Sequence, residues 1–225
     1  MIDKKWTLFL DRDGVLNRRI VDGYVTQWKE FSWLPGVMEA LKILSGIFGQ
    51  IIVVSNQQGI GKGIMTEEEL MVIHTSLQKE VRQQGGRIDA IYFSPHLEKE
   101  GSFMRKPNVG MGLKARKECP AIRFRQAVMA GDTLSDMIFG RRLGMKTVFL
   151  SENKSYLKKG HKLIDFSFPD LLTFAKSVRS PQSAVLSPQS SENSPLPPPP
   201  LSSSPSPPSL SPPPPPPSPP SLSIS

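Results

Sequence analysis

Short runs of apolar, strand-forming residues alternate with segments of helical periodicity through the first 180 residues of this chain. Strands that are apolar on both faces are typical of a parallel sheet covered by helices on both sides. The pattern therefore predicts an α/β fold of three layers, with a Rossmann-like parallel sheet between two layers of helices. We expect strands at Trp6–Leu10, Ile51–Val54, Ile88–Phe93, Ala127–Ala130 and Lys146–Leu150, and helices at Val37–Leu44, from a Thr66 cap to about Gln84, at Asn108–Lys117, Leu134–Leu143 and Pro169–Val178.

The C-terminal part of the chain differs from the rest in composition. Residues 181–225 hold 18 of the 23 prolines, consist mostly of Ser, Pro and Leu, and carry one charge, on Glu192. Such a segment cannot bury a core, and its proline runs favour polyproline II. We therefore expect one folded domain, residues 1–180, and a disordered tail, residues 181–225. The tail can be read as a ligand for a proline-recognising domain, as a linker or as a sequence artefact.

Charge and cysteine content narrow the class of protein. The formal net charge is +8, and without the tail's Glu192 it is +9, which suits anionic partners such as phosphorylated metabolites or nucleic acid. Cys119 is the only cysteine, so a disulfide within the chain and a thiolate metal cluster are both excluded. We recognise no signal peptide and no apolar run long enough to span a membrane. We therefore expect a cytoplasmic protein, a monomer with no membrane partner.

Two carboxylates follow the first expected strand at the point where ligands bind in parallel α/β sheets. Asp11 and Asp13 are two positions apart, and strand periodicity puts such side chains on one side. Two carboxylates at one point repel each other unless a cation lies between them or one is protonated. The pair suits a Mg²⁺-assisted reaction, with one carboxylate as nucleophile and the other as acid and base. Asp and Gly14 are also ordinary turn formers, so the motif alone does not distinguish a catalytic pair of carboxylates from a plain turn after the strand.

Groups that suit phosphate oxygens are expected at the same edge of the sheet. Ser55 and Asn56 leave the second strand for a Gly-rich loop, whose hydroxyl and backbone N–H groups can donate to an anion. Arg105 and Lys106 precede Pro107, and a lysine at a phosphoryl site neutralises charge as the transition state forms. Taken singly, the Gly-rich loop can be an ordinary flexible loop, and Arg105 and Lys106 can be an ordinary pair of solvated cations.

A further pair of carboxylates begins a helix after the fourth strand. Asp132 and Asp136 are four positions apart, which places them on one helix face. Mg²⁺ prefers oxygen ligands, so Asp132 is a candidate metal ligand with Asp136 supporting it from behind. The alternative is that either carboxylate only caps the helix.

Together and in this order, these groups resemble the four motifs of the haloacid dehalogenase superfamily of phosphatases. The resemblance covers about residues 5–150. It implies that Asp11 attacks phosphorus and forms an aspartyl-phosphate, and that Asp13 protonates the leaving oxygen and then deprotonates water. It also implies that Mg²⁺ lies between the Asp11 carboxylate, the Asp13 backbone carbonyl and Asp132, while Ser55 and Lys106 hold the phosphoryl oxygens.

Finer features resemble the D,D-heptose 1,7-bisphosphate phosphatases and, in part, the histidinol-phosphate phosphatases. They are Gly23-Tyr24-Val25, Ser55-Asn56-Gln57-x-Gly59-Ile60 and Arg105-Lys106-Pro107. The resemblance implies removal of the 7-phosphate from D-glycero-D-manno-heptose 1,7-bisphosphate. The connection from the first strand to the first helix and the short loop from Tyr92 to Lys106 leave no room for a large cap domain. The substrate-binding positions that it implies are Asp22, Gly23, Tyr24, Asn56, Gln57, Gln58 and Arg105.

One loop departs from that subgroup, which usually carries a zinc site just before Arg-Lys-Pro. Its Cys-x-His is represented here by Ser94 and His96, and its later Cys-x-Cys is absent. One histidine cannot build a site that needs four ligands, so we expect no zinc. We expect the loop to pack through Phe93, Phe103 and Met104 instead.

Two alternatives come from other functional classes. A polynucleotide 3′-phosphatase shares the D-x-D-G chemistry, and the basic charge permits it. The densest lysine cluster, in residues 154–162, lies beyond the motifs with only Tyr156 for base stacking, so we expect no nucleic-acid partner. An adaptor with an inactive phosphatase domain and a working tail is disfavoured by the intact catalytic positions. We expect the partner to be a small phosphorylated metabolite.

Overall fold

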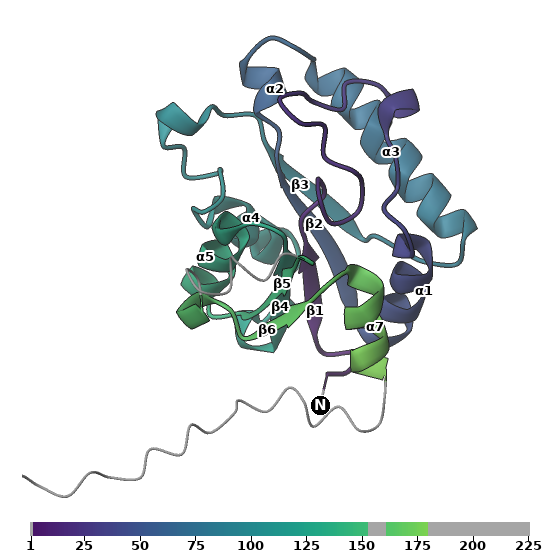
Figure 1. Cartoon of the computed structure of the whole chain (residues 1–225). Helices are drawn as coiled ribbons and strands as arrows, with labels where there is room; N and C mark the ends of the chain where they lie inside the picture. The colour runs from purple at the N-terminus through teal and green to yellow at the C-terminus, as the bar shows by residue number, and fades with distance from the viewer. Residues whose placement is uncertain (1, 153–160, 180–225) are drawn as a thin grey trace, which may run out of the picture. The chain divides into compact units, whose positions relative to one another are not determined.

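A computed structural model describes residues 2–152 and 161–179 of the chain (Figure 1). The chain divides into two units, Met1–Pro188 and Gln189–Ser225, and every described residue belongs to the first. The predicted tail, residues 181–225, and most of the lysine cluster in residues 154–162 lie outside the described residues.

Six parallel strands form a single sheet in the order β3-β2-β1-β4-β5-β6. They are β1 (Thr7–Leu10), β2 (Gln50–Asn56), β3 (Ala90–Ser94), β4 (Ala127–Gly131), β5 (Lys146–Leu150) and β6 (Phe166–Phe168). The central strand β1 pairs with β2 on one side and β4 on the other. All five predicted strands are confirmed. The sequence prediction missed β6, because three residues are too few to show an alternating pattern.

Helices cover both faces of this sheet, which confirms the three-layer prediction (Figure 1). They are α1 (Val37–Ile47), α2 (Gln58–Gly61), α3 (Glu67–Gln83), α4 (Gly110–Glu118), α5 (Leu134–Leu143) and α7 (Leu171–Arg179), with 3₁₀ turns at Trp28–Glu30, Glu98–Glu100, Phe124–Gln126 and His161–Leu163. Residues of α1, α3 and α7 pack on one face, and residues of α4 and α5 pack on the other. The part of the chain that the structure describes contains no large cap domain.

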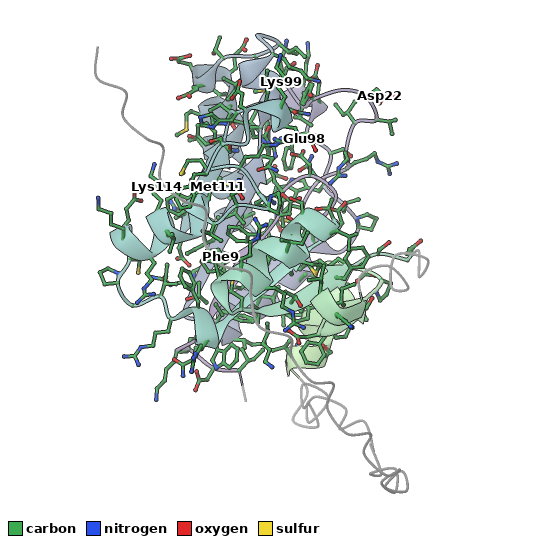
Figure 2. All side chains as sticks on the ribbon, turned by 90° about the vertical axis from the view of Figure 1, so that its left-hand side faces the viewer. Phe9, Asp22, Glu98, Lys99, Met111 and Lys114 are labelled. Carbon is green, nitrogen blue, oxygen red and sulfur yellow. The ribbon has the colours of Figure 1, made fainter. Side chains whose placement is uncertain are left out.

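The central strand shows why its end is held so firmly. Leu8 and Leu10 point into the core under α1, α3 and α7, whereas Phe9 points into the core under α4 and α5. All three side chains are fully buried, and each contributes about 1.5–3 kcal/mol by its burial. The strand therefore delivers the residue that follows it, Asp11, to a fixed place at the edge of the sheet (Figure 2 shows Phe9 within the molecule).

The longest helix, α3, begins at the capping box that the sequence predicts. The Thr66 hydroxyl accepts from the Glu69 amide at 3.2 Å, and the Glu69 carboxylate accepts from the Thr66 amide at 2.8 Å. These bonds satisfy two donors that a helix start leaves unpaired. Among the described residues, no helix has the length and apolar character needed to cross a bilayer.

The loop between β3 and α4 is held by polar contacts. Asn108 Nδ2 donates to Ser102 O at 3.0 Å, and Arg142 Nη1 donates to Asn108 Oδ1 at 2.9 Å. The predicted packing holds for Phe93 and Met104, which contact the two cores. It is wrong for Phe103, whose side chain is 59% exposed, because these main-chain and amide contacts fix the loop without it.

Candidate active site

A cavity of about 720 Å³ lies at the carboxyl ends of the strands. Every predicted catalytic and substrate-binding residue lines it, as does Asp136. They are Asp11, Asp13, Asp22, Gly23, Tyr24, Ser55, Asn56, Gln57, Gln58, Arg105, Lys106 and Asp136. Asp132 is not among the lining residues; it is paired with Arg19 instead.

Asp11 is the first residue after β1, and sheet pairing continues into it. Its amide donates to Ala130 O at 3.0 Å, so the main chain is fixed on the β4 side. The residue is only 6% exposed. Burial raises the pKa of Asp11 to about 6, although the charge of Lys106 opposes the rise. Above that pH the carboxylate is ionised, which is the form that a nucleophile requires.

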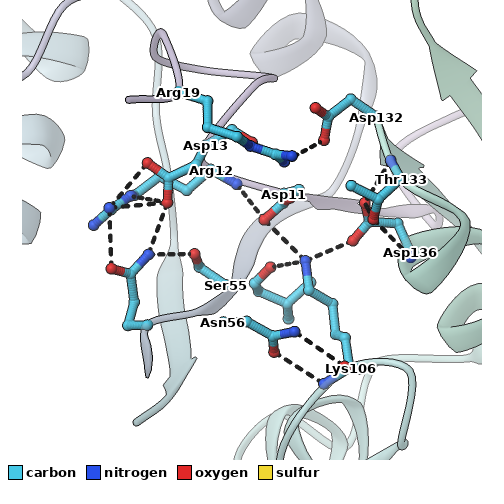
Figure 3. A network of polar contacts seen from close by, with 12 residues as sticks. Asp11, Arg12, Asp13, Arg19, Ser55, Asn56, Lys106, Asp132, Thr133 and Asp136 are labelled. Carbon is cyan, nitrogen blue, oxygen red and sulfur yellow. Dashed lines mark hydrogen bonds and ion pairs between the residues drawn. The ribbon is translucent and has the colours of Figure 1, made fainter. Parts of the chain in front are cut away.

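Lys106 lies buried between two carboxylates (Figure 3). Its Nζ is 2.8 Å from Asp11 Oδ1 and 2.6 Å from Asp136 Oδ1, and it donates to Val54 O at 2.7 Å. Burial opposes the charge, but the two carboxylates outweigh it and raise the pKa of Lys106. The ammonium is therefore a fixed positive charge beside Asp11, the predicted nucleophile, as phosphoryl transfer needs.

Asn56 holds the main chain of that lysine. Asn56 Oδ1 accepts from Lys106 N at 2.9 Å, and Asn56 Nδ2 donates to Lys106 O at 3.0 Å (Figure 3). From the sequence, Asn56 is expected to bind substrate, and this stays a prediction. In the structure both ends of its amide bond the backbone of Lys106, and these bonds hold that lysine in position.

Asp136 belongs both to the helix cap of α5 and to the site. Its Oδ2 accepts from Thr133 N at 3.1 Å and from Thr133 Oγ1 at 2.6 Å, while its Oδ1 faces Lys106. A Cβ on Gly131 would lie 2.4 Å from Asp136 Cβ, so only glycine allows this close approach. Asp136 therefore completes the cap of α5 and pairs with Lys106 at the same time.

Three carboxylates meet at one point. One ligand oxygen from each of Asp11, Asp132 and Asp136 lies within 4.8 Å of the other two. Burial, followed by the charge of Asp11, raises the pKa of Asp132 to about 7. Acidic groups with raised pKa values and oxygen donors only are the environment that Mg²⁺ fits. The structure thus places Asp136 in the same acidic cluster as Asp11 and Asp132, whereas the sequence predicts only that it supports Asp132 from behind.

Arg19 is a site residue that sequence reasoning missed. Its Nη2 donates to the main-chain oxygen of Asp13 at 2.8 Å and to Asp132 Oδ1 at 3.0 Å (Figure 3). These are two of the three oxygens expected to bind the metal, so a positive group already lies between them. No spacing rule could find this residue, because the loop after Asp13 must fold back to bring it there.

The Asp13 carboxylate is held by four donors. Its Oδ1 accepts from Arg12 Nη2 at 3.0 Å and Asn17 Nδ2 at 2.9 Å; its Oδ2 accepts from Arg12 Nε at 3.1 Å and Gln57 Nε2 at 2.8 Å. Burial raises the pKa of Asp13, but the Arg12 charge and these bonds outweigh it and hold the pKa below its ordinary value. Gln57 Nε2 also donates to Ser55 Oγ at 2.7 Å. Gln57, expected to contact substrate, therefore links the two predicted catalytic residues.

The outer part of the cavity carries the groups expected to meet the rest of a substrate. Gly59 packs against the ring of Tyr24, since a Cβ there would lie 3.1 Å from Tyr24 Cγ. Lys62 Nζ lies 5.3 Å from the centroid of that ring. Asp22 and Glu98, from loops far apart in the sequence, both line the cavity and lie toward the same end of the molecule in Figure 2. This part of the cavity is lined by polar and charged groups.

Comparison with known proteins agrees with this geometry. A family model described as HAD-hydrolase-like matches residues 103–171. The D-glycero-alpha-D-manno-heptose-1,7-bisphosphate 7-phosphatase of Mycobacterium tuberculosis is 36% identical over 174 residues, which cover 77% of this chain and 92% of the relative. The beta-anomer 7-phosphatase of Pasteurella multocida is 33% identical over 186 residues, which cover 78% of this chain and all of the relative.

A solved structure gives the same match at the level of the fold. The D,D-heptose 1,7-bisphosphate phosphatase from B. bronchiseptica, complexed with magnesium and phosphate, superposes with a TM-score of 0.69. The two sequences are 25% identical, and the match covers 77% of this chain and 97% of that one.

Proposed function

Because this chain belongs to the heptose-1,7-bisphosphate 7-phosphatases of the haloacid dehalogenase-like hydrolases, we propose that it removes the 7-phosphate of D-glycero-D-manno-heptose 1,7-bisphosphate. The observation that carries the proposal is the buried Asp11, which lies beside the Lys106 ammonium and within a cluster of three carboxylates. A nucleophile, a fixed cation and an oxygen-lined cation site are the parts that in-line phosphoryl transfer needs.

In the first step, an Asp11 carboxylate oxygen attacks phosphorus, the bond from phosphorus to the sugar oxygen breaks, and that oxygen takes a proton from Asp13. In the second step, Asp13 takes a proton from water, the water oxygen attacks phosphorus, and Asp11 leaves as a carboxylate. Ser55 and Lys106 hold the phosphoryl oxygens throughout. When bound by Asp11, the Asp13 main-chain oxygen and Asp132, Mg²⁺ would neutralise phosphoryl charge.

The protonation of Asp13 sets a condition on the first step. In the described conformation its low pKa makes it ionised, which is the form that takes a proton from water. To act as an acid it must first gain a proton. A phosphate ester whose second pKa is about 6 brings one when it binds as the monoanion. The reaction is therefore expected to favour the monoanionic ester.

The substrate is supported by the relatives and by the outer cavity. Relatives acting on each anomer of the bisphosphate are similarly close, at 36% and 33% identity, so both anomers belong in the test. Asp22, Gly23 and Tyr24 line the cavity where a sugar is expected, and Gln58 and Arg105 line it nearby. We further propose that the enzyme acts in the cytoplasm as a monomer, with the tail as a ligand for a proline-recognising domain.

The test is phosphate release with Mg²⁺ from both heptose 1,7-bisphosphate anomers, fructose 1,6-bisphosphate, histidinol phosphate and a 3′-phosphorylated oligonucleotide. The proposal expects the highest kcat/KM for one heptose anomer. Asp11→Asn should abolish release, because an amide cannot form the acyl phosphate, whereas Asp3→Asn, an exposed aspartate, is the matched control. Preference for histidinol phosphate or the oligonucleotide would overturn the substrate, and an active Asp11→Asn would overturn the mechanism.

A further inference from the structure

The acid and base Asp13 is backed by an arginine that is completely enclosed. Arg12 is 1% exposed and is the largest fully buried side chain among the described residues. Two of its nitrogens bond the Asp13 carboxylate, and Nη2 also donates to Gln57 Oε1 at 3.1 Å. A guanidinium held by these hydrogen bonds presents a rigid, planar pair of donors to the carboxylate. The third nitrogen, Nη1, points away from Asp13 and needs a partner of its own.

That partner is His74, a residue for which the proposed mechanism has no use. It lies on α3, on a buried face otherwise formed by Leu70, Ile73, Leu77 and Val81. The side chain is 2% exposed, and its Nε2 is 3.3 Å from Arg12 Nη1. A lone imidazole on an apolar helix face is costly unless it makes a bond that an apolar residue could not make.

The chemistry of the pair fixes the state of the ring. Arginine has only donors, so His74 Nε2 must be the acceptor and the ring proton must be on Nδ1. Burial, with the charge of Arg12, lowers the pKa of His74 to about 3, and the ring is neutral at any working pH. The ring also contacts the ring of Phe93 in an edge-to-face arrangement, with centroids 5.9 Å apart. The imidazole is thus held from two sides in one orientation.

We propose that His74 and Arg12 are positioning residues, which together hold the plane of the Asp13 carboxylate for proton transfer. The chain of contacts runs from α3 through Nε2 of His74 and the guanidinium to the carboxylate. With Nη1 fixed, the guanidinium cannot turn about its Cδ–Nε bond, and both arms stay on Asp13. This inference rests on the proposed role of Asp13 as acid and base.

A change of leaving group separates positioning from a merely structural role. A sugar alkoxide leaves only with a proton, so its release depends on a well-placed Asp13. A p-nitrophenolate group leaves without one. Because kcat/KM reports only the steps up to formation of the aspartyl-phosphate, it is blind to the later action of Asp13 as a base. Loss of positioning should therefore lower kcat/KM for the sugar phosphate and spare it for p-nitrophenyl phosphate.

The variants are His74→Leu, which removes the acceptor, and His74→Gln, whose amide oxygen restores it. We expect His74→Leu to lower kcat/KM for the sugar phosphate about tenfold, a part of the 10²–10⁴ that proton transfer contributes, with the change in kcat and not in KM. The value for p-nitrophenyl phosphate should stay within about twofold, and His74→Gln should regain most of the loss. Gln78→Leu is the control, since Gln78 also lies on α3 and its side-chain amide donates to Ile88 O, away from Arg12 and Asp13.

Equal losses on both substrates, or no rescue by glutamine, would overturn the inference. If His74→Leu does not fold, His74→Thr serves instead, because its shorter side chain cannot reach Arg12 and the same selective loss is expected. Asp13→Asn separates the inference from its premise. A selective loss in Asp13→Asn without one in His74→Leu overturns the positioning role alone, whereas an unselective Asp13→Asn overturns the acid role and the inference with it.

Discussion

Replacement of Lys106 by methionine tests the electrostatics of the site most directly. The ammonium lies 2.8 Å from Asp11 and 2.6 Å from Asp136, and the side chain is fully enclosed. Methionine is apolar and of similar length, so the volume is largely kept while the charge is lost. The three carboxylates of the cluster then face one another without their buried cation.

The size of the effect follows from two limits. Two ionised carboxylates at the 4.8 Å of the cluster repel by about 3.5 kcal/mol at an effective dielectric constant of 20. The repulsion is capped because a carboxyl can take up a proton, which costs only about 1.4 kcal/mol at pH 7 for Asp11, whose pKa is already raised to about 6. This cap keeps the loss below the roughly 3–5 kcal/mol seen when one partner of a buried ion pair is removed. We expect the metal-free protein to lose about 2 kcal/mol in its free energy of unfolding, or about 4–8 °C in Tm.

The loss should depend on pH in a defined direction. The pKa of Asp11 is already raised to about 6, and removal of the lysine charge raises it further. A carboxyl with a higher pKa in the folded than in the unfolded state binds more protons when folded, so stability falls as pH rises between the two values. At pH 5, below its pKa of about 6, Asp11 is already mostly protonated in the wild type, so the mutation adds little protonation cost there. The destabilisation should therefore shrink from about 2 kcal/mol at pH 7 to less than about 1 kcal/mol at pH 5.

Urea denaturation in EDTA at pH 5 and pH 7 measures both values. The matched control is Lys79→Met, because Lys79 is an exposed lysine on α3, and we expect it to change stability by less than about 0.5 kcal/mol. A loss below about 1 kcal/mol at pH 7, or the same loss at both pH values, would show that Lys106 does not neutralise the cluster.

Three further predictions concern the same cluster. Arg19→Gln should tighten Mg²⁺ binding about two- to fivefold, because the half-exposed guanidinium no longer competes for Asp132 and the Asp13 oxygen; calorimetry showing weaker binding contradicts this. Asp132→Asn should stabilise the metal-free protein at pH 8 by about 2 kcal/mol and abolish the Tm increase with Mg²⁺, since a carboxyl with a pKa of about 7 is unfavourably ionised there. The metal-free wild type should lose stability as the pH rises from about 4 to about 7, because Asp11 and Asp132 ionise less readily in the folded than in the unfolded state. The lowered pKa of Asp13 affects stability only below that range. A Tm in EDTA that rises from about pH 4 to about pH 7 would refute the reasoning.

The layers of the fold and the chemistry expected at the edge of the sheet could be predicted from the sequence. Apolar runs and helical periods are local signals, and they predicted the five longer strands and the main helices. Because parallel strands end at one edge, the order of the motifs also brought Asp11, Ser55, Lys106 and Asp132 to one place before any coordinates were known. The capping box at Thr66 was equally readable, since its partners are three residues apart.

The orientations of the site side chains and the partners that they contact depend on the tertiary structure. Arg12 and His74 are 62 positions apart, and Arg19 and Asp132 are 113 apart, so no local pattern relates them. The amide of Asn56 bonds the backbone of Lys106 at both ends, because a neighbouring loop offers both a donor and an acceptor. Loops from different strands meet only after the sheet has formed, and their packing then selects one partner for each polar group that it buries.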